Sequence, residues 1–173
     1  GRLLWRASTL FSEEPLIIEW LSSFTETDIY LDIGANVGSY VALAKKLHPN
    51  ICVYAAELDF NNIYLMYKNL VINNLQDNVL VLPFALAGSK RLSQIHYRDL
   101  SQGDALQSMD KSSPFDTMKS QKAHVFSHLT YALDDLICDY NLMQPSMIKV
   151  DVDGNELAVL EGSRKTLRNT QMI

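Results

Sequence analysis

Short, mainly apolar runs alternate along this chain with longer segments in which apolar residues recur every three to four positions. The short runs have the pattern of buried strands and cover residues 28–34, 51–57, 78–86 and 147–152. The segments with helical spacing cover residues 11–24, 40–47, 61–74, 131–140 and 154–168. Apolar strands that alternate with helices are typical of a parallel sheet covered on both faces. The pattern therefore predicts an α/β fold.

The pattern changes between residues 88 and 130, where Ser, Gln, Asp and Lys predominate. Two short alternating runs, 92–97 and 123–128, flank a polar stretch at 101–120. We interpret this region as a β-ribbon with a loop, inserted away from the main sheet. Because the sequence shows no internal repeat, coiled coil or second domain, we predict that residues 1–173 form one domain. Its parts are an N-terminal helical segment (1–27), a first half (28–87), the insert (88–130) and a last strand and helix (131–173).

Composition narrows the classes of partner. The 173 residues carry 15 Lys and Arg against 20 Asp and Glu, a net charge of −5, which argues against general nucleic-acid binding. No apolar stretch approaches the roughly 20 residues that cross a bilayer, so we expect no membrane span. Cys52 and Cys138 lie in apolar runs, which favours buried, reduced thiols and a cytoplasmic protein. The first residue is Gly1 rather than Met, so we expect a segment of a longer gene product.

The turn after the first predicted strand, DIGANVG at 32–38, carries specific chemistry. Glycines between a strand and a helix bring backbone N–H groups to a ligand. The dinucleotide fingerprint G-x-G-x-x-G fits poorly, because Asn36 and Ser39 stand where two of its glycines belong. Glu57 ends the next strand, nineteen residues after the last glycine of the turn, where a carboxylate can accept both hydroxyls of a ribose. The pattern thus indicates a ligand that has a ribose but no pyrophosphate, and the nearby acid Asp32 suits a ligand with an amino group. S-adenosylmethionine has these features. The alternative is that residues 32–38 are a plain strand-to-helix turn and that Glu57 is a solvated acid.

A second acidic cluster ends the last predicted strand, in the sequence KVDVD at 149–153. Strand periodicity places Lys149, Asp151 and Asp153 on one face. Ligands of open α/β sheets bind outside the carboxyl ends of the strands, so these residues should lie beside the first turn. Lys149 is either a substrate contact or a counter-ion for its neighbours. Glu156, in the first turn of the next helix, is either functional or a helix-start acid.

Several motifs together resemble the FkbM-type methyltransferases of the class I, Rossmann-like superfamily. They are DIGANVGSY at 32–40, VYAAE at 53–57, PFALAG at 83–88 and IKVDVDGNELAVLEG at 148–162. The resemblance spans about residues 28–168 and implies a mostly parallel central sheet with helices on both faces. It also implies a further strand and an antiparallel pair after Ile173, so we expect C-terminal strands to be missing from this chain. Two positions depart from the family pattern: Leu58 stands for a usual proline, and Asp153 for a more frequent glutamate.

The resemblance implies S-adenosylmethionine as the cofactor and assigns residues to its three parts. The residues implied for the methionine part are Asp32, Gly34, Ala35, Asn36 and Gly38. The residues implied for the ribose are Glu57 and the adjacent Leu58, and those for the adenine slot are Phe84, Ala85 and Leu86. Residues 28–87 would thus be the cofactor-binding half of the domain.

Reactions of the family are mostly O-methylations of hydroxyl groups on sugars or small metabolites, with no metal required. The resemblance therefore implies a sugar or small-molecule hydroxyl acceptor and no nucleic-acid partner. Because the methyl group of a sulfonium is already activated, the main task of the protein is to align that hydroxyl. We expect Asp151 to orient the acceptor and to take its proton, with Lys149 and Asp153 beside it.

The insert is expected to cover the acceptor site, with His96, Tyr97, Arg98, His124 and His128. A metal site from these histidines is not expected, because i, i+4 spacing in a strand lacks the closure that zinc requires. Two alternatives to a methyltransferase remain open at this point. One is a catalytically degenerate domain that binds S-adenosylmethionine, and the other is an NAD(P)-dependent oxidoreductase.

Overall fold

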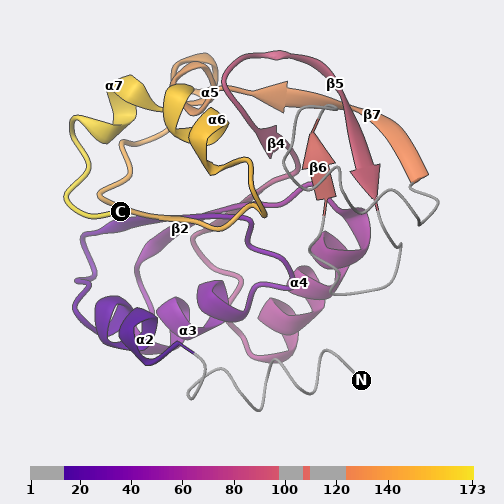
Figure 1. The fold of residues 1–173 in the computed structure, drawn as a ribbon. Helices are drawn as coiled ribbons and strands as arrows, with labels where there is room; N and C mark the ends of the chain where they lie inside the picture. The colour runs from indigo at the N-terminus through magenta and orange to yellow at the C-terminus, as the bar shows by residue number, and fades with distance from the viewer. Residues whose placement is uncertain (1–13, 98–106, 110–123) are drawn as a thin grey trace.

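The computed structural model describes residues 14–97, 107–109 and 124–173 (Figure 1). Its main sheet has four parallel strands in the order β3-β2-β1-β8. Their bounds are Ile29–Ile33 for β1, Cys52–Ala56 for β2, Val79–Leu82 for β3 and Met147–Val150 for β8. The strand order reverses at β1, which lies between β2 and β8. Such a switch point is where open α/β sheets bind ligands, outside the carboxyl ends of the strands.

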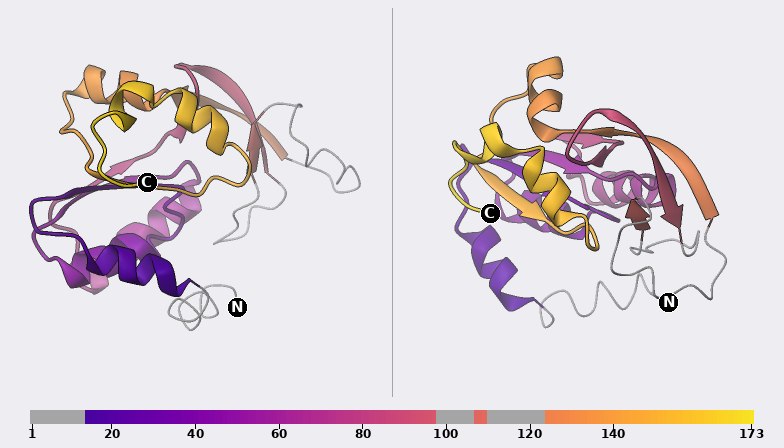
Figure 2. Two further views of the ribbon diagram at one scale, coloured as in Figure 1. Left: turned by 60° about the vertical axis from the view of Figure 1, so that its left-hand side comes forward. Right: turned by 45° about the horizontal axis from the view of Figure 1, so that its top comes forward.

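Helices cover both faces of this sheet, as the sequence pattern predicts (Figures 1 and 2). One face is covered by α2 (Pro15–Ser22), α3 (Ser39–Leu47) and α4 (Phe60–Ile72). The other is covered by α5 (Leu133–Tyr140), α6 (Glu156–Glu161) and α7 (Arg164–Leu167). Successive side chains of β1 divide between the two cores: Tyr30 packs in the cluster of the first three helices, and Leu31 in that of the others. A Rossmann-like α/β fold is therefore confirmed.

A second sheet has the order β4-β7-β5-β6 and contains much of the predicted insert. Its strands are β4 (Ala85–Leu86), β5 (Arg91–Tyr97), β6 (Gln107–Met109) and β7 (His124–Tyr131). Strand β5 pairs antiparallel with β6 and β7, which confirms the expected β-ribbon. The right-hand view of Figure 2 shows β5 and β7 running side by side away from the main sheet. Arg98 and most of the polar stretch at 101–120 lie outside the described residues.

The prediction of one strand over 78–86 is wrong. Strand β3 ends at Leu82, and the chain enters the second sheet at Ala85. Pro83 stands at the break, where it has no N–H to donate to a ladder. The N–H of Phe84 instead donates to the carbonyl of Leu82 at 2.9 Å. The run is apolar throughout because both of its halves are buried, each in a different sheet.

Two helix predictions also change at their ends. Tyr131 ends β7, so the helix predicted over 131–140 begins at Leu133. The helix predicted over 154–168 is two short helices, separated at Gly162. A Cβ atom on Gly162 would lie 2.1 Å from the carbonyl oxygen of Ala87, so only glycine permits this close approach of the chain to β4.

Of the helix predicted over 11–24, the described part is α2. After α7 the chain runs along β8: Met172 forms a parallel bridge with Met147, and the N–H of Ile148 donates to the carbonyl of Met172 at 3.1 Å.

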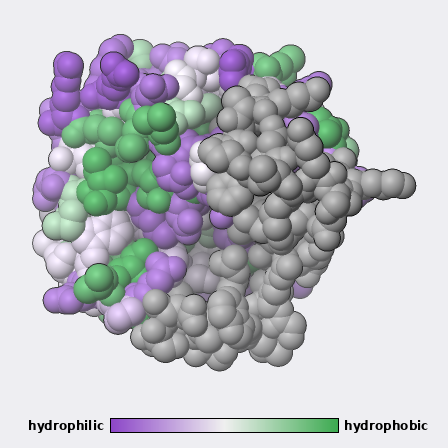
Figure 3. All heavy atoms as spheres, in the orientation of Figure 1, coloured by the Kyte–Doolittle hydropathy of each residue, from purple (hydrophilic) through white to green (hydrophobic). Residues whose placement is uncertain are grey.

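Among the described residues, none of the helices is both long and apolar enough to cross a membrane. Figure 3 shows hydrophilic and apolar residues intermixed on one face of the molecule.

The expectation of two buried thiols is wrong for Cys138, which is exposed, whereas Cys52 is half-buried. Helix α5 turns Leu133 and Leu136 into the core, and Cys138, two positions later, falls outside this stripe. Both thiols are free. An apolar run around a cysteine therefore does not by itself place the thiol inside.

Candidate functional site

A cavity of about 290 Å³ opens at the carboxyl ends of β1, β2 and β8. Eleven of the thirteen residues predicted for the site line it. These residues are Gly34, Ala35, Asn36, Glu57, Leu58, Phe84, Ala85, Leu86, Lys149, Asp151 and Asp153. Asp32 and Gly38 do not line it. The fold thus brings the glycine turn, the acid after β2 and the acidic cluster after β8 to one place.

The glycine turn is shaped by close approaches on both sides. Gly34 has a φ of +82°, and a Cβ atom there would lie 1.9 Å from the backbone oxygen of Asp151. Gly38 has a φ of +79°, and its Cβ would lie 2.5 Å from the side chain of Met66. The N–H groups of Gly34 and Ala35 both donate to the carbonyl of Ala56 at 3.0 Å. The turn is therefore held against β2 and β8. Gly38 packs against Met66 of α4 and does not line the cavity.

Glu57 lines the cavity and is only 6% exposed. Its carboxylate connects the loop after β1 with the loop after β2. Its Oε2 accepts the N–H of Asn36 at 2.8 Å, and its Oε1 accepts the N–H groups of Leu58 and Asp59, both at 2.8 Å. Burial raises the pKa of Glu57 to about 7, although these backbone donors favour the charged form. A carboxylate has room for about four hydrogen bonds and three are taken, so Oε2 of Glu57 can still accept one hydroxyl group of a ligand.

A buried ion pair lies behind the other end of the cavity. The ammonium of Lys149 lies 3.3 Å from Oδ1 of Asp32 and 3.2 Å from Oδ2 of Asp151. Asp32 is fully buried, whereas the side chain of Asp151 is 61% exposed. Burial would lower the pKa of Lys149, but the charges of the two carboxylates outweigh it and raise that pKa. Burial raises the pKa of Asp32, and Lys149 opposes this rise.

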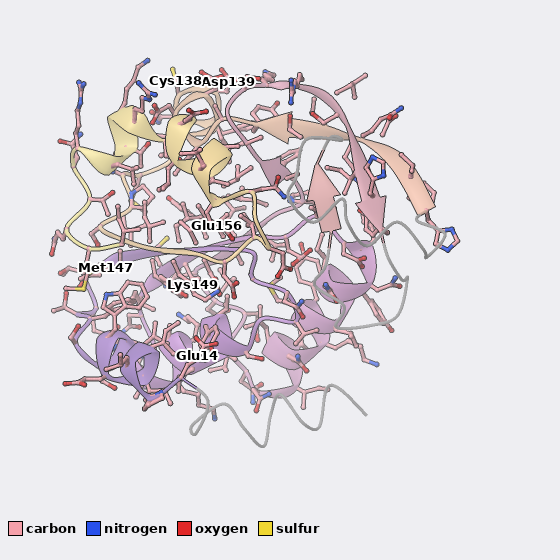
Figure 4. All side chains as sticks on the ribbon, in the orientation of Figure 1. Glu14, Cys138, Asp139, Met147, Lys149 and Glu156 are labelled. Carbon is pink, nitrogen blue, oxygen red and sulfur yellow. The ribbon has the colours of Figure 1, made fainter. Side chains whose placement is uncertain are left out.

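Figure 4 places Lys149 near the middle of the molecule, with Glu14 on the α2 side of it and Glu156 on the α6 side. Lys149 pairs with two acids, as the counter-ion interpretation predicts, and it also lines the cavity. The substrate contact stays a prediction. Glu156 accepts the N–H groups of Val152 at 3.3 Å and Gly154 at 3.0 Å. Its carboxylate therefore closes the turn before α6, as a helix-start acid does.

Asp153 lines the cavity, but strand periodicity, from which we predicted its position, is not what places it there. Strand β8 ends at Val150, and Asp153 has a left-handed φ of +49°. It is followed by Gly154 at +97°. Alternation thus accounts for Lys149 and Asp151, which contact each other, whereas Asp153 reaches the cavity through a turn.

The sequence prediction missed several residues that line the cavity: Glu14, Ser39, Tyr40, Ile95 and Asn155. Tyr40 is half-buried, and the ammonium of Lys149 lies 5.1 Å from the centre of its ring. Burial and the charge of Glu14 raise the pKa of Tyr40, so its hydroxyl stays a hydrogen-bond donor. Ser39 and Tyr40 begin the helix after the glycine turn, which is a signal that could have identified them. Nothing in the sequence singles out Ile95, because its position depends on how the second sheet folds back.

The comparisons with known proteins agree with this geometry. A sequence model of the FkbM methyltransferase domain matches residues 32–173. The hexuronic acid methyltransferase AglP of Haloferax volcanii is 23% identical over 173 aligned residues. That alignment covers 98% of this chain and 64% of the relative, so this chain spans less than two thirds of its length.

Solved structures share the fold. The FkbM methyltransferase of Methylobacillus flagellatus superposes with a TM-score of 0.58 at 19% identity, over 92% of this chain and 34% of that one. A precorrin-6y C5,15-methyltransferase of Geobacter metallireducens superposes with a TM-score of 0.50 at 13% identity, over 87% of this chain and 54% of that one. At these identities the similarity concerns the fold alone.

Proposed function

Because this chain belongs to the FkbM methyltransferase family, we propose that it transfers the methyl group of S-adenosylmethionine to a hydroxyl group of a sugar or another small molecule. The observation that carries this proposal is Glu57, buried beside the glycine turn with both oxygens fixed by backbone N–H groups. A carboxylate held in this way keeps one acceptor position on Oε2, which is suited to a hydroxyl group of a ribose.

The polarity of the cavity supports this cofactor. One end is charged, with Lys149 and Asp151, and the other is apolar, with Leu58, Phe84 and Leu86. S-adenosylmethionine has the same order of parts: a charged amino-acid group, a ribose and a flat base. Because Gly34 has no Cβ, the glycine turn packs directly against the backbone oxygen of Asp151, which brings the turn beside the charged end of the cavity. The turn remains a poor dinucleotide site, because Asn36 and Ser39 occupy glycine positions.

In this proposal the protein supplies alignment rather than activation. When bound, S-adenosylmethionine brings a methyl group that its sulfonium already activates. Asp151 accepts the hydrogen bond of the acceptor hydroxyl at the mouth of the cavity, and Lys149 holds the Asp151 carboxylate in place. The Asp151 side chain is 61% exposed, so both an acceptor and solvent can reach it. Asp151 is thus proposed to orient the hydroxyl, with Asp153 beside it. As the methyl–sulfur bond breaks, S-adenosylhomocysteine would be the leaving group, and the hydroxyl proton would pass by way of Asp151 to solvent.

The acceptor class is inferred from two sources. The name of the relative from Haloferax volcanii states a hexuronic acid as what that protein methylates. Carboxylates that line an open cavity, here Asp151 and Asp153, are suited to accept hydrogen bonds from sugar hydroxyls. A neutral sugar or a hexuronic acid is the acceptor that we would test first.

Substitution of Asp151 by asparagine should slow methyl transfer without weakening cofactor binding. We expect kcat to fall about 10²-fold, the scale of a misplaced reacting group, because the amide orients the hydroxyl less well. The affinity for S-adenosylhomocysteine should change less than about twofold, because Lys149 can still donate to the amide oxygen. The measurement is transfer of labelled methyl from S-adenosylmethionine to methyl glycosides of neutral hexoses and of hexuronic acids, with calorimetry for binding.

Asp139→Asn is the matched control, because Asp139 is a partly exposed acid on α5 that pairs with Lys90 away from the cavity. It should keep the wild-type rate. Full turnover by Asp151→Asn with intact cofactor binding would show that Asp151 has no role in alignment. If the wild-type protein binds S-adenosylhomocysteine but transfers no methyl to any hydroxyl acceptor, the proposed enzyme activity is wrong and the chain is a binding module.

A further inference from the structure

The second sheet reaches the cavity through one described side chain of its β5–β7 pair. Ile95 of β5 lines the cavity, while Leu92 on the same strand is 76% exposed. Residues two apart in a strand share a face, so Ile95 and Tyr97 point to the inside and Leu92 points to the opposite side. Ile95 lies at the apolar end of the cavity, together with Leu58 and Ala85.

Ile95 is held rigidly at that end. It is fully buried and packs in a cluster with Ala85 and Tyr97, against which Leu58 also packs. Its strand position is fixed on both sides, since Ile95 lies opposite Met109 of β6 and Phe126 of β7. The hydroxyl of Tyr97, next on the inner face, lies 2.9 Å from Nε2 of His128 and ties β5 to β7. A wall supported in this way does not adapt easily to a ligand of another size.

The order of groups along the cavity says which part of the ligand meets this wall. Glu57 marks the ribose, and the charged residues Lys149 and Asp151 lie at the glycine-turn end. Leu58 follows Glu57 directly, on the side away from those charges, and Ile95 packs with it. The flat base attached to the ribose would therefore lie between the Leu58 side chain, which Ile95 supports, and the loop that carries Phe84.

We propose that Ile95 supports the base-binding end of the cavity from behind Leu58 and Ala85, so that the second sheet sets the affinity of the site for the adenine base. This inference rests on the proposed function, because it takes S-adenosylmethionine as the ligand. Ile95 has no exposed surface, so it is a positioning residue that acts through Leu58 and Ala85 and has no step in the chemistry. The β5–β7 pair then connects the base of the cofactor to the described part of the insert.

The test compares one ligand that has the base with one that lacks it. Ile95→Ala should weaken binding of S-adenosylhomocysteine about tenfold or more, because it removes three buried carbon atoms that hold Leu58 and Ala85 in place. The same substitution should leave the weaker binding of S-ribosylhomocysteine, which has the ribose and the amino acid but no base, within about twofold of wild type. Ile95→Val should restore most of the affinity for S-adenosylhomocysteine. Binding is measured by calorimetric titration, directly and by competition, well below the unfolding temperature of each variant.

Leu92→Ala is the matched control on the same strand, and it should change neither affinity, because Leu92 faces away from the cavity. Equal weakening of both ligands by Ile95→Ala would mean a general loss of structure and would overturn the proposal. So would an affinity for S-adenosylhomocysteine that does not change. If the wild-type protein itself fails to bind S-adenosylhomocysteine, the proposed function fails first, and this outcome is distinct from the other two.

Discussion

Gly34→Ala is expected to abolish cofactor binding and to destabilise the fold. A Cβ at this position would lie 1.9 Å from the backbone oxygen of Asp151, and both partners are backbone, so no side chain can rotate to relieve the clash. The φ of +82° adds the cost of a left-handed conformation. Together these effects should lower the free energy of unfolding by about 2–5 kcal/mol. The turn must also move away from the end of β8, which separates the groups that surround the cofactor.

The measurement is urea unfolding together with titration of S-adenosylhomocysteine. Gly88→Ala is the matched control, because a Cβ there meets nothing closer than the carbonyl oxygen of Ala158 at 3.6 Å, an ordinary contact. It should bind and unfold as the wild type does. A Gly34→Ala variant with wild-type stability and binding would contradict the close approach of the glycine turn to β8.

Lys149→Met is expected to be the most destabilising change in the charge cluster. Lys149 is the described cation that faces the fully buried Asp32, at 3.3 Å. Without it Asp32 keeps a buried charge with no compensation, and loss of one partner of a buried pair costs about 3–5 kcal/mol. Lys90→Met is the control, because Lys90 forms an ion pair with Asp139 in which both side chains are substantially exposed. The unfolding midpoint of that variant should change little.

The loss in Lys149→Met should depend on pH. Burial already raises the pKa of Asp32, and removal of Lys149 raises it further. An acid whose pKa is higher in the folded state destabilises that state only where the unfolded acid is ionised, above about pH 4. The deficit relative to wild type should therefore be small near pH 4 and grow as the pH rises toward 8. Urea midpoints across this range measure it.

A double variant, Asp32→Asn with Lys149→Met, separates charge from shape. It removes the buried carboxylate together with its cation and should recover much of the stability at pH 8. If the double variant is as unstable as Lys149→Met at every pH, the loss comes from packing around Lys149 and not from the charge of Asp32.

The main sheet could be predicted from sequence because its strands are buried on both faces. Apolar runs such as 51–57 are then continuous, and the intervening helices leave a clear period. Because buried strands are continuously apolar, the sequence does not show where the chain passes from one sheet to the other. Residues 78–86 stay apolar across the break at Pro83, since the residues on both sides of it are buried, each in a different sheet. Tyr131 is a similar case, because a buried residue before a helix looks like the first residue of that helix.

The site was predictable where a residue is fixed by local chain geometry. Gly34, Glu57 and Asp151 each follow directly after a strand of the main sheet, and parallel strands bring such positions to one edge. Asp153 was placed by a period that stops at the end of β8. Ile95 was not found because its place depends on the return of β5 over Leu58, a long-range contact that no local pattern encodes. The roles of these residues remain predictions.

The most direct measurement of the central claim is calorimetric titration of the protein with S-adenosylhomocysteine and, separately, with NAD. The cavity has a carboxylate suited to a ribose, an apolar end suited to a base, and a glycine turn that does not fit a pyrophosphate. It should therefore bind S-adenosylhomocysteine at one saturable site and give no saturable heat with NAD. Saturable binding of NAD, or no binding of S-adenosylhomocysteine, would contradict the account.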